Sequence, residues 1–215
     1  MAGKLIIVEG ASASGKSTLL AQLAKEGIVI RGVGSQNPEE NKNLIQESRR
    51  ILGDTILNFK EALAKSPDER DNVFLRFTQI AKVQLEEAIR LKNEGNTVFL
   101  NRSAISVATF LRIPLEIAEP AKKAETSTWL NRVIKVNNET QAMLVREADG
   151  IVLLTSASVG GKEREGVRGL QELESSIINE LSERISQETG IPFLKLDANI
   201  TSVEEEVTLV KEFIA

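Results

Sequence analysis

The stretch Glu9-Gly10-Ala11-Ser12-Ala13-Ser14-Gly15-Lys16-Ser17-Thr18 decides how this chain folds. It contains the pattern Gly-x-x-x-x-Gly-Lys-Ser, which is typical of a phosphate-binding loop when a strand precedes it and a helix follows. Both flanks fit. Residues 4–8 form a short apolar, β-branched run, and the leucines after the loop recur at helical spacing. We therefore expect a buried strand, the loop and a helix in that order.

Each residue type in this loop has a physical task in nucleotide binding. Gly10 and Gly15 let the backbone turn sharply and approach a ligand without a Cβ in the way. The backbone N–H groups and the N-terminus of the following helix face phosphate oxygens. Lys16 supplies a cation for the β- and γ-phosphates, and the Ser17 hydroxyl is a ligand for Mg²⁺. The residues predicted to bind ATP and Mg²⁺ are Gly10, Ala11, Ser12, Ala13, Ser14, Gly15, Lys16, Ser17 and Thr18.

The composition argues against several other classes of protein. The 215 residues carry a net charge of −4, which is unlike a general nucleic-acid binder. The absence of cysteine excludes disulfides and thiolate metal sites, and the absence of histidine removes the commonest general base. No apolar run approaches the ~20 residues of a membrane span, and the first strand leaves no room for a signal peptide. We expect a cytoplasmic protein without nucleic-acid or membrane partners.

Short apolar strands alternate with helical patterns along the rest of the chain. Further strands are expected at residues 27–31, 97–100, 150–155 and 192–197. Helices are expected at residues 41–52, 56–64, 68–94, 104–111, 121–148, 170–185 and 203–214, with an irregular piece between Pro114 and Pro120. This alternation predicts an α/β fold, a doubly wound parallel sheet of about five strands with helices on both faces. We expect a single domain over residues 1–215.

Residues 156–169 contain four glycines and five charged residues. This composition predicts a mobile loop, which would act as a lid over the site. Cations on such a loop neutralise charge as a phosphoryl group transfers, and guanidinium geometry favours Arg164 and Arg168 over Lys162. Acidic residues alternate with these cations, as they also do in a solvated surface loop, so both interpretations stay open.

Other candidates follow the strands, because the carboxyl ends of parallel strands line the site in such sheets. Glu9 is a candidate for holding a metal-bound water or orienting an acceptor, and the alternative is an ordinary strand-end acid. Arg102, in Asn101-Arg102-Ser103, is a candidate clamp for phosphoryl oxygens. The alternative for Arg102 is a structural pair with a nearby acid.

The long helix holds candidates for binding an acceptor base. An aromatic ring can stack on a base and an amide can pair with its edge, which points to Phe77 and Gln79, with Arg76 beside them. Phe77 lies on the apolar face of the helix, so core packing is the favoured interpretation. Gln79 and Arg76 lie off that face, where the alternative is simple solvation.

Several stretches, in order along the chain, match one family. They are residues 7–18, Arg31 after the second strand, residues 74–77 and 95–98, Asn101-Arg102-Ser103, and residues 196–198 with 202–207. Together they make the chain resemble the thymidylate kinase group of nucleotide and nucleoside kinases over nearly its whole length. Asn101-Arg102-Ser103 stands where thymidylate kinases carry Asp-Arg-Tyr and deoxynucleoside kinases carry Glu-Arg-Ser. The resemblance implies a P-loop kinase that uses ATP and Mg²⁺, and a homodimer, since that family is commonly dimeric.

The function that the resemblance implies is transfer of the γ-phosphoryl group of ATP to a nucleoside monophosphate, with a thymidylate-like acceptor favoured. The loop and Lys16 would hold the donor and Ser17 with Glu9 the metal, while Arg102 and a lid arginine would stabilise the transferring group. Asn101 has no basic lone pair to activate a nucleoside hydroxyl, whereas a monophosphate is already anionic near neutral pH. The alternatives are a deoxynucleoside kinase, with Glu9 as base, and a non-catalytic ATP-binding regulatory module.

Overall fold

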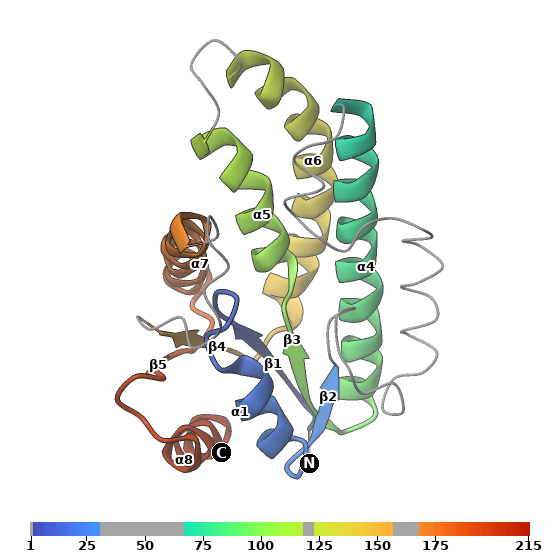
Figure 1. Cartoon of the computed structure of the whole chain (residues 1–215). Helices are drawn as coiled ribbons and strands as arrows, with labels where there is room; N and C mark the ends of the chain where they lie inside the picture. The colour runs from blue at the N-terminus through green and yellow to red at the C-terminus, as the bar shows by residue number, and fades with distance from the viewer. Residues whose placement is uncertain (1, 31–66, 118–122, 157–167) are drawn as a thin grey trace.

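The computed structural model describes residues 2–30, 67–117, 123–156 and 168–215 (Figure 1). The helices expected at residues 41–52 and 56–64 lie outside the described residues, as do Arg31 and residues 157–167 of the expected lid. The predicted single domain and the predicted lid therefore stay predictions.

Five parallel strands form one sheet. They are β1 (Lys4–Glu9), β2 (Ile28–Ile30), β3 (Thr97–Asn101), β4 (Gly150–Thr155) and β5 (Phe193–Asp197), in the order β2-β3-β1-β4-β5. β1 is central, with Val8 level with Asn101 of β3 on one side and Val152 of β4 on the other. The chain builds β2 and β3 on one side of β1 and then β4 and β5 on the other. This reversal places a crevice beside the carboxyl end of β1, where α/β sheets bind ligands.

Helices cover both faces of the sheet, so the predicted doubly wound α/β fold is confirmed (Figure 1). One face carries α1 (Lys16–Leu23) and α8 (Val203–Ile214), which pack against Ile6 and Val8 of β1. The other carries α4 (Pro67–Asn93), α5 (Ala104–Ile117), α6 (Lys123–Glu147) and α7 (Arg168–Thr189), which pack against Leu5 and Ile7. All four β1 side chains are buried, as expected for a strand covered on both faces.

Helix boundaries differ most from the expected ones at α5 and at α7, which continues to Thr189, beyond the expected residue 185. α5 continues through Pro114 to Ile117, so the irregular piece expected after Pro114 is wrong for residues 114–117. Proline removes one helical N–H bond and its ring clashes with the carbonyl of the preceding turn. The preceding Leu111 and Ile113 are nevertheless buried in the core, which holds this turn in place. α7 begins at Arg168, so the last two residues of the expected loop are helical. The first turn of a helix needs no apolar side chain, and periodicity therefore does not reveal it.

Candidate active site

The phosphate loop joins β1 to α1 with the curled backbone that its glycines predict. Gly10 has φ 145°, Ala13 has φ 65° and Gly15 has φ 92°, all in the region that side chains disfavour. A Cβ on Gly10 would lie 2.4 Å from the carbonyl oxygen of Leu154, so no other residue fits there. Gly15 is the N-cap of α1 and offers no side-chain cap. The first N–H groups of α1 thus have no side-chain cap, and their binding of a phosphate stays a prediction.

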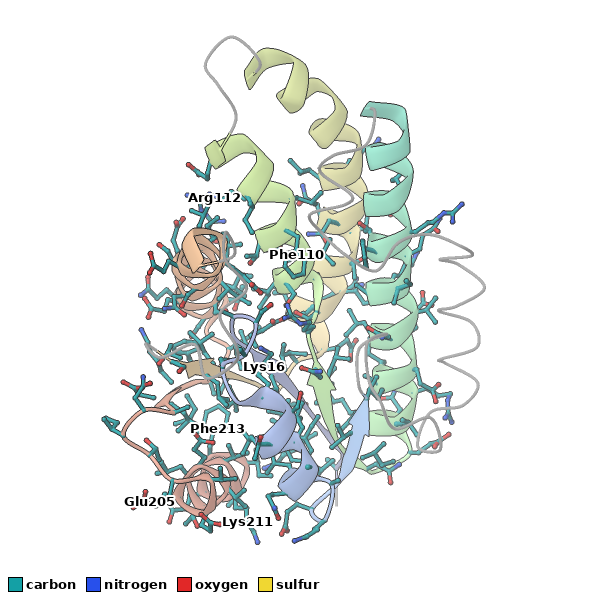
Figure 2. The ribbon with its side chains drawn as sticks, viewed as in Figure 1. Lys16, Phe110, Arg112, Glu205, Lys211 and Phe213 are labelled. Atoms are coloured by element: carbon teal, nitrogen blue, oxygen red, sulfur yellow. The ribbon has the colours of Figure 1, made fainter. Side chains whose placement is uncertain are left out.

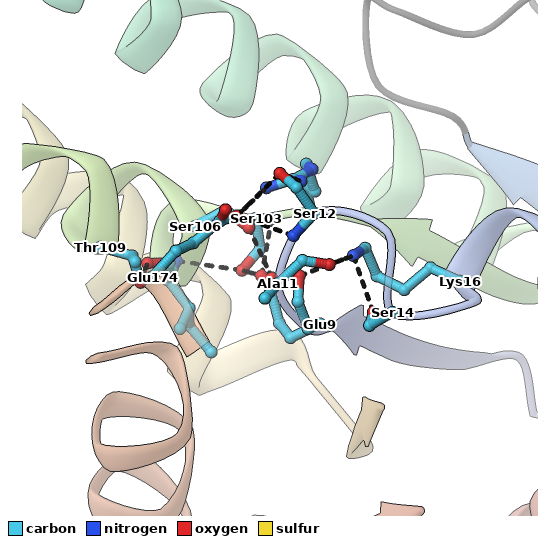
Figure 3. Close-up of polar contacts among 12 residues, drawn as sticks. Glu9, Ala11, Ser12, Ser14, Lys16, Ser103, Ser106, Thr109 and Glu174 are labelled. Atoms are coloured by element: carbon cyan, nitrogen blue, oxygen red, sulfur yellow. Dashed lines mark hydrogen bonds and ion pairs between the residues drawn. The ribbon is translucent and has the colours of Figure 1, made fainter. Parts of the chain in front are cut away.

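Lys16 lies inside this loop (Figure 3). Its ammonium donates to the carbonyl oxygens of Gly10 at 2.6 Å and Ala11 at 2.5 Å, and to the Ser14 hydroxyl at 3.2 Å. Burial, assisted by the nearby Arg102 guanidinium and opposed by the carboxylates of Glu9 and Glu174, lowers the pKa of Lys16 to about 7. The folded chain therefore binds the Lys16 proton far less tightly than an exposed lysine does.

This pKa predicts how stability depends on pH. Between about pH 7 and the ordinary value of 10.5, the unfolded chain binds the Lys16 proton and the folded chain does not, so the free energy of unfolding rises with pH. Lys16→Met should remove this contribution. Urea unfolding of both proteins from about pH 6 to about pH 9 measures it. The free energy of unfolding of Lys16→Met should exceed that of the wild type by an amount that shrinks as pH rises. A difference between the two proteins that stays constant over this pH range would contradict the prediction.

Glu9 is buried at the end of β1 and connects that strand to α5. Its Oε1 accepts from the Ser103 N–H at 2.8 Å and the Ser103 hydroxyl at 2.6 Å, and its Oε2 accepts from the Ser106 hydroxyl at 2.6 Å (Figure 3). Ser103 also caps α5 by accepting from the N–H of Ile105 at 3.1 Å. A carboxylate here is favoured by the positive end of the helix dipole. Both oxygens of Glu9 are thus already bonded within the protein, and its metal and catalytic roles stay predictions.

Arg102 follows β3 and lies against the phosphate loop. Its φ of 64° is left-handed, and its N–H donates to the carbonyl oxygen of Val8 at 3.1 Å. The guanidinium donates to the Ser12 hydroxyl at 3.3 Å and pairs with Glu174, with Nη1 and Oε1 3.4 Å apart. It also lies 5.3 Å from the ring centroid of Phe110, which Figure 2 labels on α5. The structural pair of Arg102 with an acid is therefore present, and its role as a clamp for phosphoryl oxygens stays a prediction.

Glu174 is the site residue that the sequence reasoning missed. It lies on α7, and its Oε1 accepts from the Ser12 N–H at 3.1 Å and from the Ser12 hydroxyl at 3.2 Å. The signal was present, because Glu174 lies on the face of α7 that carries the buried Ile177, Ile178 and Leu181. A single acid on an apolar helix face is seldom buried without a partner, and here the partners are Ser12 and Arg102.

The other predicted residues lie at different places. Asn101 ends β3 beside Arg102, and its Oδ1 is buried without a hydrogen-bond partner among the described residues. Ser17 and Thr18 are exposed on the first turn of α1. The part of the chain that the structure describes contains no group of three or more His, Cys, Asp or Glu residues placed to hold a metal ion, and none of its helices is long and apolar enough to cross a membrane.

The predicted acceptor and lid residues remain untested. On α4, Arg76 and Phe77 are half-buried and Gln79 is exposed, and their contact with a base stays a prediction. Arg168 is the first residue of α7, and its side chain is outside the described part. Arg164 lies in the segment that is not described.

Comparison with known proteins shows the fold and no closer relationship. No protein-family model matches the sequence, and neither does any curated protein. Among solved structures, a thymidylate kinase from Candida albicans is similar, with a TM-score of 0.58 and 17% identity, over 99% of this chain and 91% of that chain. A thymidylate kinase from Ehrlichia chaffeensis has a TM-score of 0.57 and 13% identity, over 99% of each chain.

A deoxyadenosine kinase from M. mycoides with bound dATP is similar to the same extent. Its TM-score is 0.56 at 16% identity, over 97% of this chain and 98% of that chain. These likenesses cover nearly the whole chain and support its resemblance to the thymidylate kinase group. The two substrate classes named among these structures, a nucleotide and a nucleoside, share this one fold.

Proposed function

We propose that this protein is an ATP-dependent nucleotide kinase that transfers a γ-phosphoryl group to a nucleoside monophosphate. The observation that carries the proposal is the approach of two cations to one phosphate loop. Lys16 donates to loop carbonyls and Arg102 donates to the loop hydroxyl of Ser12. The fold that the chain shares with thymidylate and deoxyadenosine kinases supports the same reaction class.

The donor phosphates would bind along residues 10–18. Uncapped N–H groups of α1 and the backbone of the loop would bind the phosphate oxygens, and Lys16 would exchange its carbonyl partners for the β- and γ-phosphates. Magnesium usually binds through one or two protein ligands together with substrate phosphates, which fits the exposed hydroxyl of Ser17. The metal would supply charge neutralisation on the phosphates.

Phosphoryl transfer would then depend on alignment and charge. The bond between the γ-phosphorus and its bridging oxygen breaks, a bond to an acceptor oxygen forms, and ADP leaves. Arg102 would stabilise the equatorial oxygens of the transferring group. Arg164 and Arg168 remain proposed partners from the lid, because cations on a closing loop provide the same stabilisation.

The chemistry of the site favours a monophosphate acceptor over a nucleoside. A nucleoside hydroxyl needs a base, but Asn101 has none to offer, and both oxygens of Glu9 already accept hydrogen bonds from Ser103 and Ser106. A monophosphate oxygen is anionic near neutral pH, with a second pKa of about 6. It requires cations and alignment, which Arg102 provides. The thymidylate-like acceptor and the homodimer rest only on the resemblance.

A direct comparison of acceptors tests the proposal. Thymidine, deoxyadenosine and the other nucleosides are each compared with their 5′-monophosphates in the presence of ATP and Mg²⁺, and ADP release is measured. We expect turnover of at least one monophosphate in preference to every free nucleoside. Turnover of nucleosides alone would instead favour the deoxynucleoside kinase that the deoxyadenosine kinase fold suggests, and Glu9 would be the base to mutate. ATP binding without turnover of either class would favour the regulatory module.

A further inference from the structure

A carboxylate from the protein itself occupies phosphate-binding groups of the loop. Glu174 Oε1 accepts from the backbone N–H of Ser12 at 3.1 Å, and the same oxygen lies 3.4 Å from Nη1 of Arg102. A loop N–H and an arginine are the donors that bind phosphoryl oxygens in such sites. Glu174 is buried, and we define the "Glu174 contacts" as its bonds to Ser12 and Arg102.

Carboxylates of the protein itself lie beside the basic groups of the loop without any bound phosphate. Glu174 pairs with Arg102, and both Glu9 and Glu174 act on Lys16. Glu9 is directed away from the loop, toward Ser103 and Ser106 of α5. Glu174 is therefore the carboxylate that competes directly with a phosphate for the same donors.

We propose that Glu174 is a built-in competitor of the nucleotide phosphates, and that phosphate binding displaces it from Ser12 and Arg102. This inference rests on the proposed function, because it assumes that the loop binds the phosphates of a nucleotide. Two anions cannot share the Ser12 N–H and the Arg102 guanidinium at hydrogen-bond distance without strong repulsion. Nucleotide binding must therefore break the Glu174 contacts, which lowers the affinity that the loop would otherwise have.

Displacement of Glu174 also connects the loop to α7. Ile177, Ile178 and Leu181, which follow Glu174, are buried in the core and anchor the helix. On the exposed side, Arg112 of α5 pairs with Glu180 of α7, with Nη1 and Oε1 2.7 Å apart. The part of α7 that can respond to the loss of the Glu174 contacts is therefore the turn around Glu174, ahead of these anchors. Binding of nucleotide phosphates to the loop would therefore be detectable as a change in this first part of α7.

The test measures binding and needs no turnover. Glu174→Gln keeps the shape of the side chain and removes its charge, and Glu188→Gln is the matched control, because it makes the same charge change at an exposed position of α7. Affinities for Mg²⁺-ATP and for inorganic pyrophosphate are measured by calorimetry. We expect Glu174→Gln to bind both ligands about tenfold more tightly than the wild type, as for the loss of one charged competitor, and Glu188→Gln to match the wild type. If Glu174→Gln does not fold, Glu174→Ala replaces it.

Hydrogen exchange provides a second readout that a purely structural contact would not give. In the wild type, ATP should increase amide exchange over residues 172–176, whereas in Glu174→Gln this exchange should be raised without ATP and change little on its addition. Equal affinities for the wild type and Glu174→Gln would overturn the inference alone, as would weaker binding by the variant. Absence of ATP binding in both proteins would overturn the proposed function, and the inference with it.

Discussion

Lys16→Ala is expected to lower ATP affinity by about 100-fold or more, because charge-assisted contacts to two phosphates are lost together. The ammonium lies within the loop, bonded to the carbonyl oxygens of Gly10 and Ala11 and to the Ser14 hydroxyl. These acceptors belong to the loop itself, and none belongs to the apolar core. The substitution should therefore remove the cation that faces the nucleotide and leave the sheet intact.

Calorimetric titration with Mg²⁺-ATP measures the loss, and a thermal melt verifies the fold. Lys25→Ala is the matched control, because Lys25 is an exposed lysine just after α1 whose ammonium bonds only to Gln22 among the described contacts. The control should bind ATP as the wild type does. Unchanged ATP affinity in Lys16→Ala would remove the basis for nucleotide binding at this loop.

The strand, loop and helix around residues 4–23 could be predicted from sequence because their determinants are local. The continuous apolar run, the glycine spacing and the following lysine all lie within one short stretch, and each acts on its own neighbours. The long helix α4 was predicted for the same reason, with bounds within a residue of those found. Pro114 shows the limit of such local rules, because the buried Leu111 and Ile113 just before it hold a turn that proline alone disfavours.

The site was only partly predictable, because its contacts join distant parts of the chain. Glu174 lies 162 positions from Ser12, and Glu9 lies 94 positions from Ser103. The strand-end rule located Glu9 and Arg102 at one edge of the sheet. The rule does not predict that three donors at the start of α5 bond to the carboxylate of Glu9. It also does not predict that α7, which follows β4, places Glu174 beside Arg102. Which side chains bond to Glu9 and Arg102 depends on how the helices pack over the sheet.

Arg102→Ala is expected to lower kcat about 10³-fold, with a much smaller change in KM, as for arginines that stabilise charge on a transferring phosphoryl group. The guanidinium is held by the Phe110 ring, the Ser12 hydroxyl and Glu174, so it is already oriented beside the loop.

Arg102→Lys should recover only a small part of kcat, because an ammonium cannot reproduce the fork of two parallel donors. Removing the guanidinium also leaves the buried Glu174 without its cation, which destabilises the fold, so melting temperatures are measured alongside the kinetics. The double variant Arg102→Ala with Glu174→Gln should recover stability without recovering kcat. Arg112→Ala, at a partly exposed arginine of the same helix as Phe110 (Figure 2), is the matched control and should retain full turnover. A kcat for Arg102→Ala within about threefold of the wild type, small beside the expected effect, would show that Arg102 only anchors Glu174 and plays no part in transfer.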